Sequence, residues 1–399
     1  MHIGFGVTAL CNGLAGGGLD GIGNYAREIM LRMGSSKGTQ GSIDLVPFAF
    51  GCTIPKDLSK KVAVIQQSGS NGVSPTLSNS IELGRYSANT AWSVVTGANF
   101  IGIDALIKKV DLIHATDHYV PKCKPAPLVA TLMDAIPLSH PHWLRSEFRS
   151  IKNMLWTRAA NWADEVITIS EYSKIELSKW AGIPLSKITV IPLGVDERWF
   201  NEVSALDIAR VRAQYQLPEI FFISVGTLQP RKNVESTIKA HRLLSRAERL
   251  RSPLIIVGRA GWKCDEVLRL IEEDAATGAV RWLQHVPDAD LLPVLKLATA
   301  LVFPSLGEGF GLPVLEAFAA SVPVITSNTT SLPEVAGDAA IAINPLDVDQ
   351  IKDAMHKMLE DDVLVKSLKS QGLIRAHAFN WQSCVSSTLQ VYQRTIQNH

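Results

Sequence analysis

The feature that most constrains the fold is a regular alternation of short β-branched runs with stretches of helical periodicity along the whole chain. Each β-branched run ends in residues typical of turns, which is the pattern of parallel βα units. In the first half, the predicted strands are His2–Val7, Leu45–Phe50, Leu112–Thr116, Leu128–Met133, Glu165–Ser170 and Ile188–Leu193. In the second half, they are Phe221–Gly226, Leu254–Gly258, Val280–Val286, Ala300–Pro304, Pro323–Ser327 and Ala340–Asn344. This pattern predicts an α/β protein with two doubly wound sheets, whose ligands lie beyond the carboxyl ends of the strands.

The length of 399 residues and the 46% content of hydrophobic residues fit two domains, each with its own core. Residues 1–194 are predicted to form a first Rossmann-like domain and residues 195–380 a second, with a hinge at Gly194. We expect the two domains to face a cleft. The last segment, residues 381–399, is predicted to be a helix that packs back towards the first domain.

Composition excludes several classes of function. The formal net charge is only +1, so no global field favours a nucleic acid. The five cysteines are scattered without a CxxC pair, which argues against a disulfide framework and against a zinc site. No apolar run approaches the ~18–20 residues that a membrane span needs, and the first residues lack the basic region of a signal peptide. The sequence therefore predicts a cytoplasmic protein.

The most informative stretch is the glycine-studded loop and helix start at residues 303–317, which read FPSLGEGFGLPVLEA. The N–H groups at a helix start favour an anion, and Gly309 and Gly311 allow a ligand to approach the backbone closely. Glu308 stands in the loop and Glu316 one turn into the helix, where both could accept hydrogen bonds from sugar hydroxyls. The alternative is a helix-terminal charge beside a solvated glutamate.

The spacing of Glu308 and Glu316 is an E-x7-E pattern, and its setting resembles the conserved block of the retaining family 4 glycosyltransferases. The resemblance implies a GT-B fold, in which residues 1–194 are the acceptor side and residues 195–380 bind the nucleotide-sugar donor. It implies that Glu308 contacts the donor sugar and that Glu316 holds the ribose. The backbone that meets the diphosphate is then that of Gly309, Phe310, Gly311 and Leu312.

Arg231 and Lys232 follow the first predicted strand of the second half. Adjacent cations at this point suit a phosphate, because arginine donates as a fork and lysine acts as a point charge. Taken alone, an ordinary exposed basic pair is the alternative. The family resemblance implies instead that the pair neutralises the leaving diphosphate, which makes a divalent metal unnecessary.

Asp288-Ala289-Asp290 is a literal DxD, the metal motif of another glycosyltransferase fold. The two aspartates follow Pro287 and precede a helical stretch, so we interpret them as a helix N-cap and a first-turn acid. No metal ligand is therefore predicted. The preceding strand end resembles the nucleobase-side segment of the family, which implies that Val286 borders the base.

Gly21 and Gly23 belong to a G-x-G-x-x-A pattern that suggests a dinucleotide site when read by itself. The first strand ends near Val7, well before these glycines, so the context does not support that interpretation. The family resemblance implies instead a glycine loop that leans over the donor phosphates.

Members of this family commonly place a histidine beside the reacting sugar where this chain has Met133. Asp134 is the nearest polar group, and a carboxylate there could stabilise positive charge at the anomeric carbon or accept a proton. We predict Asp134 as a catalytic residue, with His114 as a less favoured partner. The alternative is that Asp134 only caps the turn that follows.

Residues 143–158 place apolar side chains at helical spacing, with Arg145, Arg149 and Lys152 on a neighbouring face. An amphipathic helix of the domain is the simpler interpretation. The alternative is a peripheral contact with the inner face of the plasma membrane or with a lipid-diphosphate acceptor, next to Trp156.

The resemblance implies retaining transfer of a hexose from a nucleotide-diphosphate sugar to a glycan or a polyprenyl-diphosphate-linked glycan, as in O-antigen or exopolysaccharide synthesis. Similarity to mannosyltransferases of that kind favours GDP-mannose, with a UDP-sugar as the alternative, and no separate cofactor. There are two alternatives from other functional classes. One is a nucleotide-sugar-binding protein of the same fold but without turnover, which Met133 in place of the usual histidine suggests, and the other is an NAD-dependent oxidoreductase.

Overall fold

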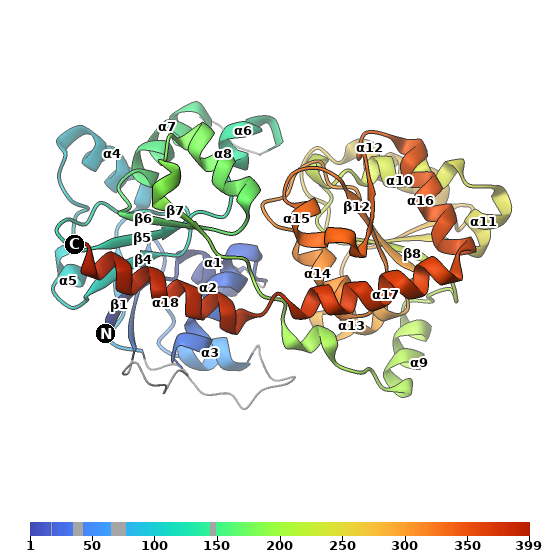
Figure 1. Cartoon of the computed structure of the whole chain (residues 1–399), viewed down its shortest axis with the longest axis horizontal. Coiled ribbons are helices and arrows are strands. Elements are labelled where there is room, and N and C mark those ends of the chain that lie inside the picture. The colour runs from blue at the N-terminus through green and yellow to red at the C-terminus, as the bar shows by residue number, and fades with distance from the viewer. Residues whose placement is uncertain (17, 35–42, 65–76, 144–148) are drawn as a thin grey trace. The chain divides into compact units, whose positions relative to one another are not determined.

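The computed structural model describes residues 1–399 except for residue 17 and residues 35–42, 65–76 and 144–148 (Figure 1). Its contacts divide the chain into two compact units. Unit 1 consists of Met1–Gly194 and Trp381–His399, and unit 2 of Val195–Asn380.

Unit 1 is built on a parallel seven-stranded sheet in the order β3-β2-β1-β4-β5-β6-β7. The strands are β1 (His2–Gly6), β2 (Asp44–Phe50), β3 (Ile81–Leu83), β4 (Leu112–Ala115), β5 (Leu128–Thr131), β6 (Glu165–Thr168) and β7 (Ile188–Val190). The predicted strands of the first half are confirmed, and β3 is an additional edge strand that the sequence did not reveal.

Helices cover both faces of this sheet. They are α1 (Thr8–Ala15), α2 (Gly21–Gly34), α3 (Leu58–Val64), α4 (Tyr86–Thr96), α5 (Asp104–Ile107), α6 (Ile136–Ser139), η1 (Pro141–Trp143), α7 (Arg149–Ala160), α8 (Glu171–Ala181), η2 (Leu185–Lys187) and α18 (Trp381–Gln397). The C-terminal helix α18 packs on α2, β5 and β6 of the same unit.

Unit 2 repeats the plan with a parallel six-stranded sheet in the order β10-β9-β8-β11-β12-β13. Its strands are β8 (Phe222–Val225), β9 (Leu254–Val257), β10 (Val280–Leu283), β11 (Ala300–Phe303), β12 (Val324–Ser327) and β13 (Ile341–Ile343). Its helices are η3 (Glu197–Phe200), α9 (Ala205–Gln214), η4 (Pro230–Lys232), α10 (Val234–Leu243), α11 (Arg246–Arg251), α12 (Asp265–Ala275), α13 (Asp288–Lys296), α14 (Leu312–Ala319), α15 (Leu332–Ala336), η5 (Gly337–Ala339), α16 (Val348–Glu360) and α17 (Asp362–His377). The fold class predicted from the sequence, two doubly wound α/β units, is confirmed.

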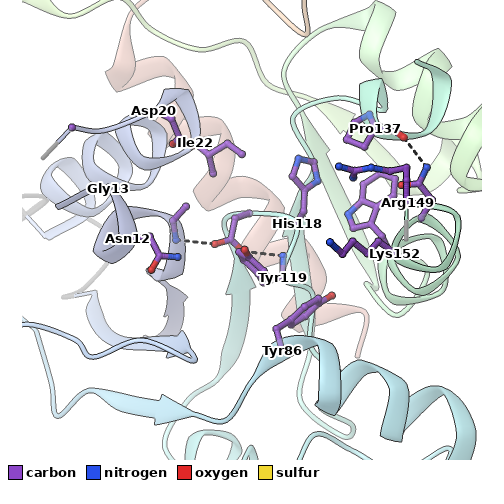
Figure 2. Close-up of a pocket in the computed structure, with 15 residues that line it drawn as sticks. Asn12, Gly13, Asp20, Ile22, Tyr86, His118, Tyr119, Pro137, Arg149 and Lys152 are labelled. Carbon is purple, nitrogen blue, oxygen red and sulfur yellow. Dashed lines mark hydrogen bonds between the residues drawn. The ribbon is translucent and has the colours of Figure 1, made fainter. Parts of the chain in front are cut away.

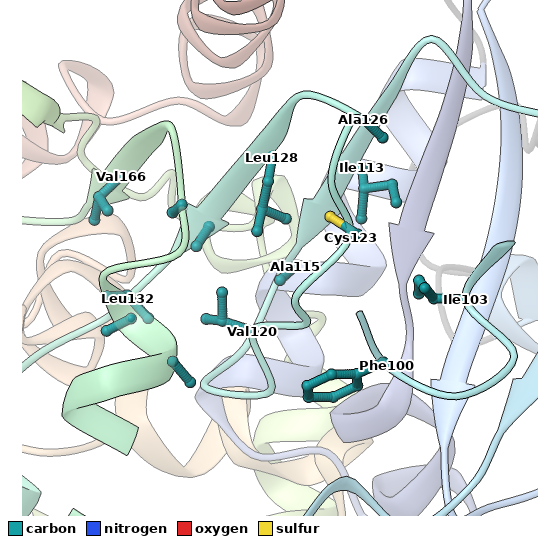
Figure 3. Close-up of a cluster of buried hydrophobic side chains, with 14 of the residues drawn as sticks. Phe100, Ile103, Ile113, Ala115, Val120, Cys123, Ala126, Leu128, Leu132 and Val166 are labelled. Carbon is teal, nitrogen blue, oxygen red and sulfur yellow. The ribbon is translucent and has the colours of Figure 1, made fainter. Parts of the chain in front are cut away.

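One face of the unit 1 sheet is covered by a cluster of buried hydrophobic side chains (Figure 3). Ile113, Leu128 and Val166 come from the neighbouring strands β4, β5 and β6 and are at most 2% exposed. Phe100 and Ile103 pack on them from the segment before β4. Removal of this apolar surface from water is the main stabilising term and fixes the carboxyl ends of the strands, where the site residues lie.

His114 of β4 belongs to the core of unit 1. Its side chain is fully buried, with Nδ1 2.6 Å from the Tyr392 hydroxyl and Nε2 2.8 Å from Thr131 Oγ1. Burial lowers the pKa of His114 to about 3, so the ring is neutral at physiological pH. Both ring nitrogens are used, and one of them fastens α18 to the sheet. The expectation that His114 could assist at the reacting sugar is therefore wrong.

Candidate functional site

The site residues of unit 2 gather where two neighbouring strands end. Arg231 and Lys232 lie in η4, shortly after β8, and Glu308 lies in the loop after β11. Strands β8 and β11 are adjacent in the sheet. The carboxyl ends of parallel strands meet at one edge, so residues far apart in the sequence form one cluster there.

Glu308 is the centre of this cluster and is 7% exposed. Its Oε1 lies 2.8 Å from Lys232 Nζ and accepts a hydrogen bond of 2.7 Å from Ser305 Oγ, and its Oε2 lies 2.5 Å from Arg231 Nη1. Burial alone would raise the pKa of Glu308, but Lys232 and Arg231 outweigh it and lower the pKa to about 2. The carboxylate is therefore charged, and the triad of Arg231, Lys232 and Glu308 carries a net charge of about +1.

The loops that carry the triad are tied together by hydrogen bonds. Arg231 Nη1 donates to the Gly307 carbonyl at 2.7 Å, and the Leu306 N–H donates to the Arg231 carbonyl at 2.8 Å. Ser331 Oγ bridges the Glu308 and Phe310 carbonyls at 2.9 and 2.8 Å. This bonding holds the charged groups in place before any ligand binds, which is what electrostatic catalysis requires.

Gly311 ends the loop and precedes α14. Its φ of 126° is a conformation that residues with a side chain rarely adopt, and a Cβ there would lie 2.8 Å from Leu332 Cδ2. Only glycine fits this turn. Helix α14 then begins with Leu312 and Pro313. Pro313 has no N–H group, and the Val314 N–H donates to the Gly311 carbonyl at 3.0 Å, so within the described residues the Leu312 N–H is the first-turn group that can meet an anion.

Glu316 lies one turn into α14, as the spacing predicted. The pKa of Glu316 is raised to about 7, mainly by burial. The positive charge of Arg198 lowers this pKa, and the negative charges of Asp196 and Asp288 raise it further. Within the described parts of the chain, no hydrogen bond holds the Glu316 carboxylate. A half-buried carboxylate of this kind is suited to gain partners from a ligand.

Three of the other predicted donor-binding residues of unit 2 lie in the loop after β11 or at the start of α14, and the fourth follows β10. Phe310 is 5% exposed and packs edge-on against Phe379, with ring centroids 5.7 Å apart. Gly309 is buried in the loop, and Leu312 is the half-buried first residue of α14. Val286 is 7% exposed but lies in the segment after β10, because that strand ends at Leu283 and not at Val286.

The two aspartates of the DxD sequence differ from the expectation in one detail. Helix α13 begins at Asp288, and its N-cap is Pro287, so both aspartates are first-turn acids and neither is the cap. Asp290 Oδ1 accepts from Arg210 at 2.7 Å and Oδ2 from the Tyr215 hydroxyl at 2.6 Å, which ties α13 to α9. Among the described residues, no group of three or more His, Cys, Asp or Glu side chains is arranged to hold a metal ion.

Gly21 and Gly23 do not form the loop that was expected. They lie in the first turn of α2, and the Gly23 N–H donates to Asp20 Oδ1 at 2.7 Å. Glycine alone does not indicate a helix start. The signal for the start of α2 was Asp20, whose side chain accepts from a first-turn N–H group. A helix start still presents N–H groups, but the Gly23 N–H is already used.

Asp134 lies half-buried after β5, and its Oδ1 accepts from the Ile136 N–H at 2.9 Å. The carboxylate therefore caps the turn into α6, as the alternative interpretation proposed. Its charge also acts on His118, raising a pKa that burial lowers. Met133 is 6% exposed and packed in the core, so it adds no polar group.

A cavity of about 480 Å³ lies at the carboxyl end of the unit 1 sheet (Figure 2). The sequence analysis did not identify Asp117, His118 and Tyr119, which line it. The available signal was their position directly after β4, where parallel sheets bind ligands. Arg149 and Lys152 also line it, so the basic face of α7 borders a pocket of its own unit.

The membrane interpretation of residues 143–158 rests partly on Arg145, which lies outside the described residues. Helix α7 is described from Arg149 to Ala160. Across the described ranges, no helix combines the length and the apolar character needed to cross a bilayer.

Two family models match the chain, one almost wholly within unit 1 and the other within unit 2. The model described as glycosyltransferase family 4 matches residues 85–199, and the model described as glycosyl transferases group 1 matches residues 207–374. The second match contains all of the Arg231, Lys232 and Glu308 cluster.

Among curated proteins, the O-antigen chain mannosyltransferase B of Escherichia coli is 36% identical over 229 residues, which are 57% of this chain and 60% of that protein. The serotype-specific mannosyltransferase WbdA of Escherichia coli is 31% identical over 239 residues, 59% of this chain and 29% of that protein. The chain thus matches less than two thirds of each of these relatives. Among solved structures, HepE of Anabaena in complex with UDP covers 99% of this chain and is itself fully covered, with a TM-score of 0.73 and 17% identity. That similarity concerns the fold.

Proposed function

Because the chain belongs to the GT-B glycosyltransferases that the group 1 and family 4 models describe, we propose that it moves a hexose from a nucleotide-diphosphate sugar to a glycan hydroxyl, with retention at the anomeric carbon. The observation that carries the proposal is the cluster of Arg231, Lys232 and Glu308 beside the start of α14.

The charge of the cluster suits a departing diphosphate. Two cations share one carboxylate, so an anion that enters meets one uncompensated positive charge. Lys232 is largely shielded from water, with its side chain 13% exposed, and its Nζ lies 4.6 Å from the centroid of the Phe303 ring, so its field is stronger than that of a solvated cation. Charge that develops on the leaving group is therefore stabilised by preorganised donors, without a metal in the proposed mechanism.

Glu308 and Glu316 take different roles in this proposal. Glu308 accepts a hydrogen bond from a hydroxyl of the donor sugar, close to the cations that meet the diphosphate. Glu316 accepts from the ribose hydroxyls, and its raised pKa is expected to fall when they bind, because hydrogen bonds favour the charged form. Gly309, Phe310, Gly311 and Leu312 are proposed to present the backbone that meets the diphosphate.

GDP-mannose is the proposed donor, because two relatives are mannosyltransferases by name. A UDP-sugar is the second candidate, because the structural neighbour HepE was solved with UDP. The proposed acceptor is a glycan or a polyprenyl-linked glycan, as the O-antigen context of the first relative supports.

Asp134 remains the proposed catalytic group of unit 1. Its Oδ1 is engaged by the Ile136 N–H, and its charge reaches the His118 side chain. A carboxylate at this strand end could stabilise positive charge at the anomeric carbon while it also caps the turn.

Isothermal titration calorimetry with GDP, GDP-mannose, UDP and UDP-glucose tests the donor assignment. We expect the Lys232→Met variant to bind the preferred nucleotide at least about tenfold more weakly, because it loses a cation that is largely shielded from water. Lys239→Met removes an exposed cation of α10 in the same unit and is the matched control. Equal weakening in both variants, or no binding of any nucleotide, would refute the assignment.

A further inference from the structure

The cavity of unit 1 gathers buried side-chain nitrogen atoms that no described residue pairs by hydrogen bonding. His118 Nδ1, Arg149 Nε and Trp156 Nε1 are buried and have no hydrogen-bond partner among the described residues. All three side chains line the same cavity. Buried polar atoms are nearly always paired, so the two unpaired N–H donors of Arg149 and Trp156, with the His118 ring nitrogen beside them, indicate a ligand that accepts hydrogen bonds.

The sequence of α7 explains why these donors converge. Arg149, Lys152 and Trp156 are three and four residues apart, so they share one face of the helix. His118 reaches the same face from the loop after β4, and its ring lies 5.3 Å from the Trp156 ring, edge to face. A donor-rich wall with the positive charges of Arg149 and Lys152 favours a phosphate or a carboxylate.

The opposite wall of the cavity is lined by hydrogen-bond acceptors. Figure 2 shows Asn12 and Asp20 across the space from Arg149 and Lys152, with His118 between them. Asp117, which also lines the cavity, accepts from the Ala9 and Tyr119 N–H groups at 3.2 and 3.0 Å. Carboxylates and amides suit hydroxyl groups, so the cavity is arranged for a ligand with an anion at one end and hydroxyls at the other.

The available space fits more than a bare anion. The cavity of about 480 Å³ adjoins a second of about 500 Å³, which shares Tyr86, Tyr119 and Trp156 with it and adds Arg85. Both volumes lie in the range of small-molecule sites. The shared aromatic rings offer flat apolar surfaces for the ring of a sugar.

We propose that this cavity binds an acceptor sugar that carries an anionic group, a phosphate ester or a carboxylate, held by Arg149, Trp156 and His118. The inference rests on the proposed function and adds the substrate class of the acceptor. The anion is distinct from the donor diphosphate, which the proposal places at Arg231 and Lys232 of unit 2.

The test is calorimetric binding of methyl α-mannoside, its 6-phosphate, methyl glucuronide, inorganic phosphate and pyrophosphate to the whole protein, each with and without saturating GDP. We expect an anionic glycoside to bind at least about tenfold more tightly than the neutral one, and GDP to leave this difference unchanged. The phosphate, uronate and pyrophosphate arms identify which anion the site takes.

Two variants locate the site. Arg149→Met should remove the preference for the anionic glycoside, and Arg149→Lys should restore only part of it, because lysine lacks the Nε–H group. Arg158→Met removes an exposed cation of the same helix that does not line the cavity, and it should leave affinity within about twofold. Unchanged melting temperatures and GDP affinities establish that these variants fold and keep the donor site.

The proposal is overturned if neutral and anionic glycosides bind equally, if Arg149→Met and Arg158→Met behave alike, or if GDP displaces the anion. Failure of GDP and all nucleotide sugars to bind would instead refute the proposed function and leave the anion preference of the cavity measurable by itself.

Discussion

Replacement of Glu308 by glutamine should destabilise unit 2 strongly, because it leaves Lys232 and Arg231 beside each other without their shared carboxylate. The size of the expected loss of stability follows from the pKa of Glu308, which is lowered from 4.5 to about 2. That shift corresponds to about 3 kcal/mol of free energy of unfolding, near the lower end of the cost of breaking a buried ion pair. For a unit of this size, the melting temperature should fall by about 6–12 °C.

The pH dependence provides an internal check on the cause. A carboxylate with a lowered pKa stabilises the folded protein above its unfolded value of 4.5, and this stability is lost as the pH falls from 4.5 towards 2. The difference in melting temperature between wild type and Glu308→Gln should therefore be constant between about pH 6 and 8 and should shrink below about pH 4.

A second consequence of Glu308→Gln concerns anions. Without the Glu308 charge that offsets the two cations, the variant should bind pyrophosphate more tightly than wild type does, although it should transfer sugar more slowly. Differential scanning calorimetry with and without pyrophosphate measures both effects. Glu235→Gln removes a surface partner of Lys239 and should change stability by no more than about 1 kcal/mol. A Glu308→Gln variant as stable as this control, or one with weaker pyrophosphate binding than wild type, would refute the reasoning.

Three further predictions concern Glu316, Asp134 of unit 1 and the need for a metal ion. Glu316→Gln should become more stable relative to wild type as the pH rises from about 4.5 through 7, by at most about 3 kcal/mol, because the raised pKa makes the charged form of Glu316 unfavourable in the folded protein. A difference in melting temperature between Glu316→Gln and wild type that is the same at pH 5 and at pH 8 would contradict this. Asp134→Asn should lower turnover by about 10²-fold or more and leave the calorimetric affinity for donor nearly unchanged; wild-type turnover would remove Asp134 from the catalytic groups. Activity should persist in excess EDTA, because Arg231 and Lys232 take the place of a metal; complete loss that Mn²⁺ or Mg²⁺ restores would overturn that assignment.

The sequence predicted the sheets well because most strands are buried on both faces and read as short apolar runs. Edge strand β3 escaped because its three residues, Ile81–Leu83, are too few to show a period and are only partly buried. The EGFGLPVLEA stretch predicted the loop and the start of α14. Pro313 is tolerated in the first turn of a helix, and Gly311 suits the turn that precedes it.

Other features of the site depend on contacts that no local pattern contains. The pairing of Glu308 with Arg231 and Lys232 joins residues 76 or more positions apart, and only the order of strands in the sheet brings them together. His114 looked like a site histidine, but the Tyr392 hydroxyl from the far end of the chain buries it. His118 did not look like a site residue in the sequence. Its burial beside α7, with Nδ1 lacking a hydrogen-bond partner among the described residues, depends on how the chain folds.

Transfer itself is the most direct test of the account. Wild type, Lys232→Met and the control Lys239→Met are incubated with GDP-mannose, and separately with UDP-glucose, together with a mannose-terminated glycan, and the new linkage is identified by the anomeric proton in NMR spectra. We expect a product of the same anomeric configuration as the donor, formed at least about 10²-fold more slowly by Lys232→Met than by wild type, and at the wild-type rate by Lys239→Met. An inverted linkage, or equal rates for the Lys232→Met variant and wild type, would contradict it.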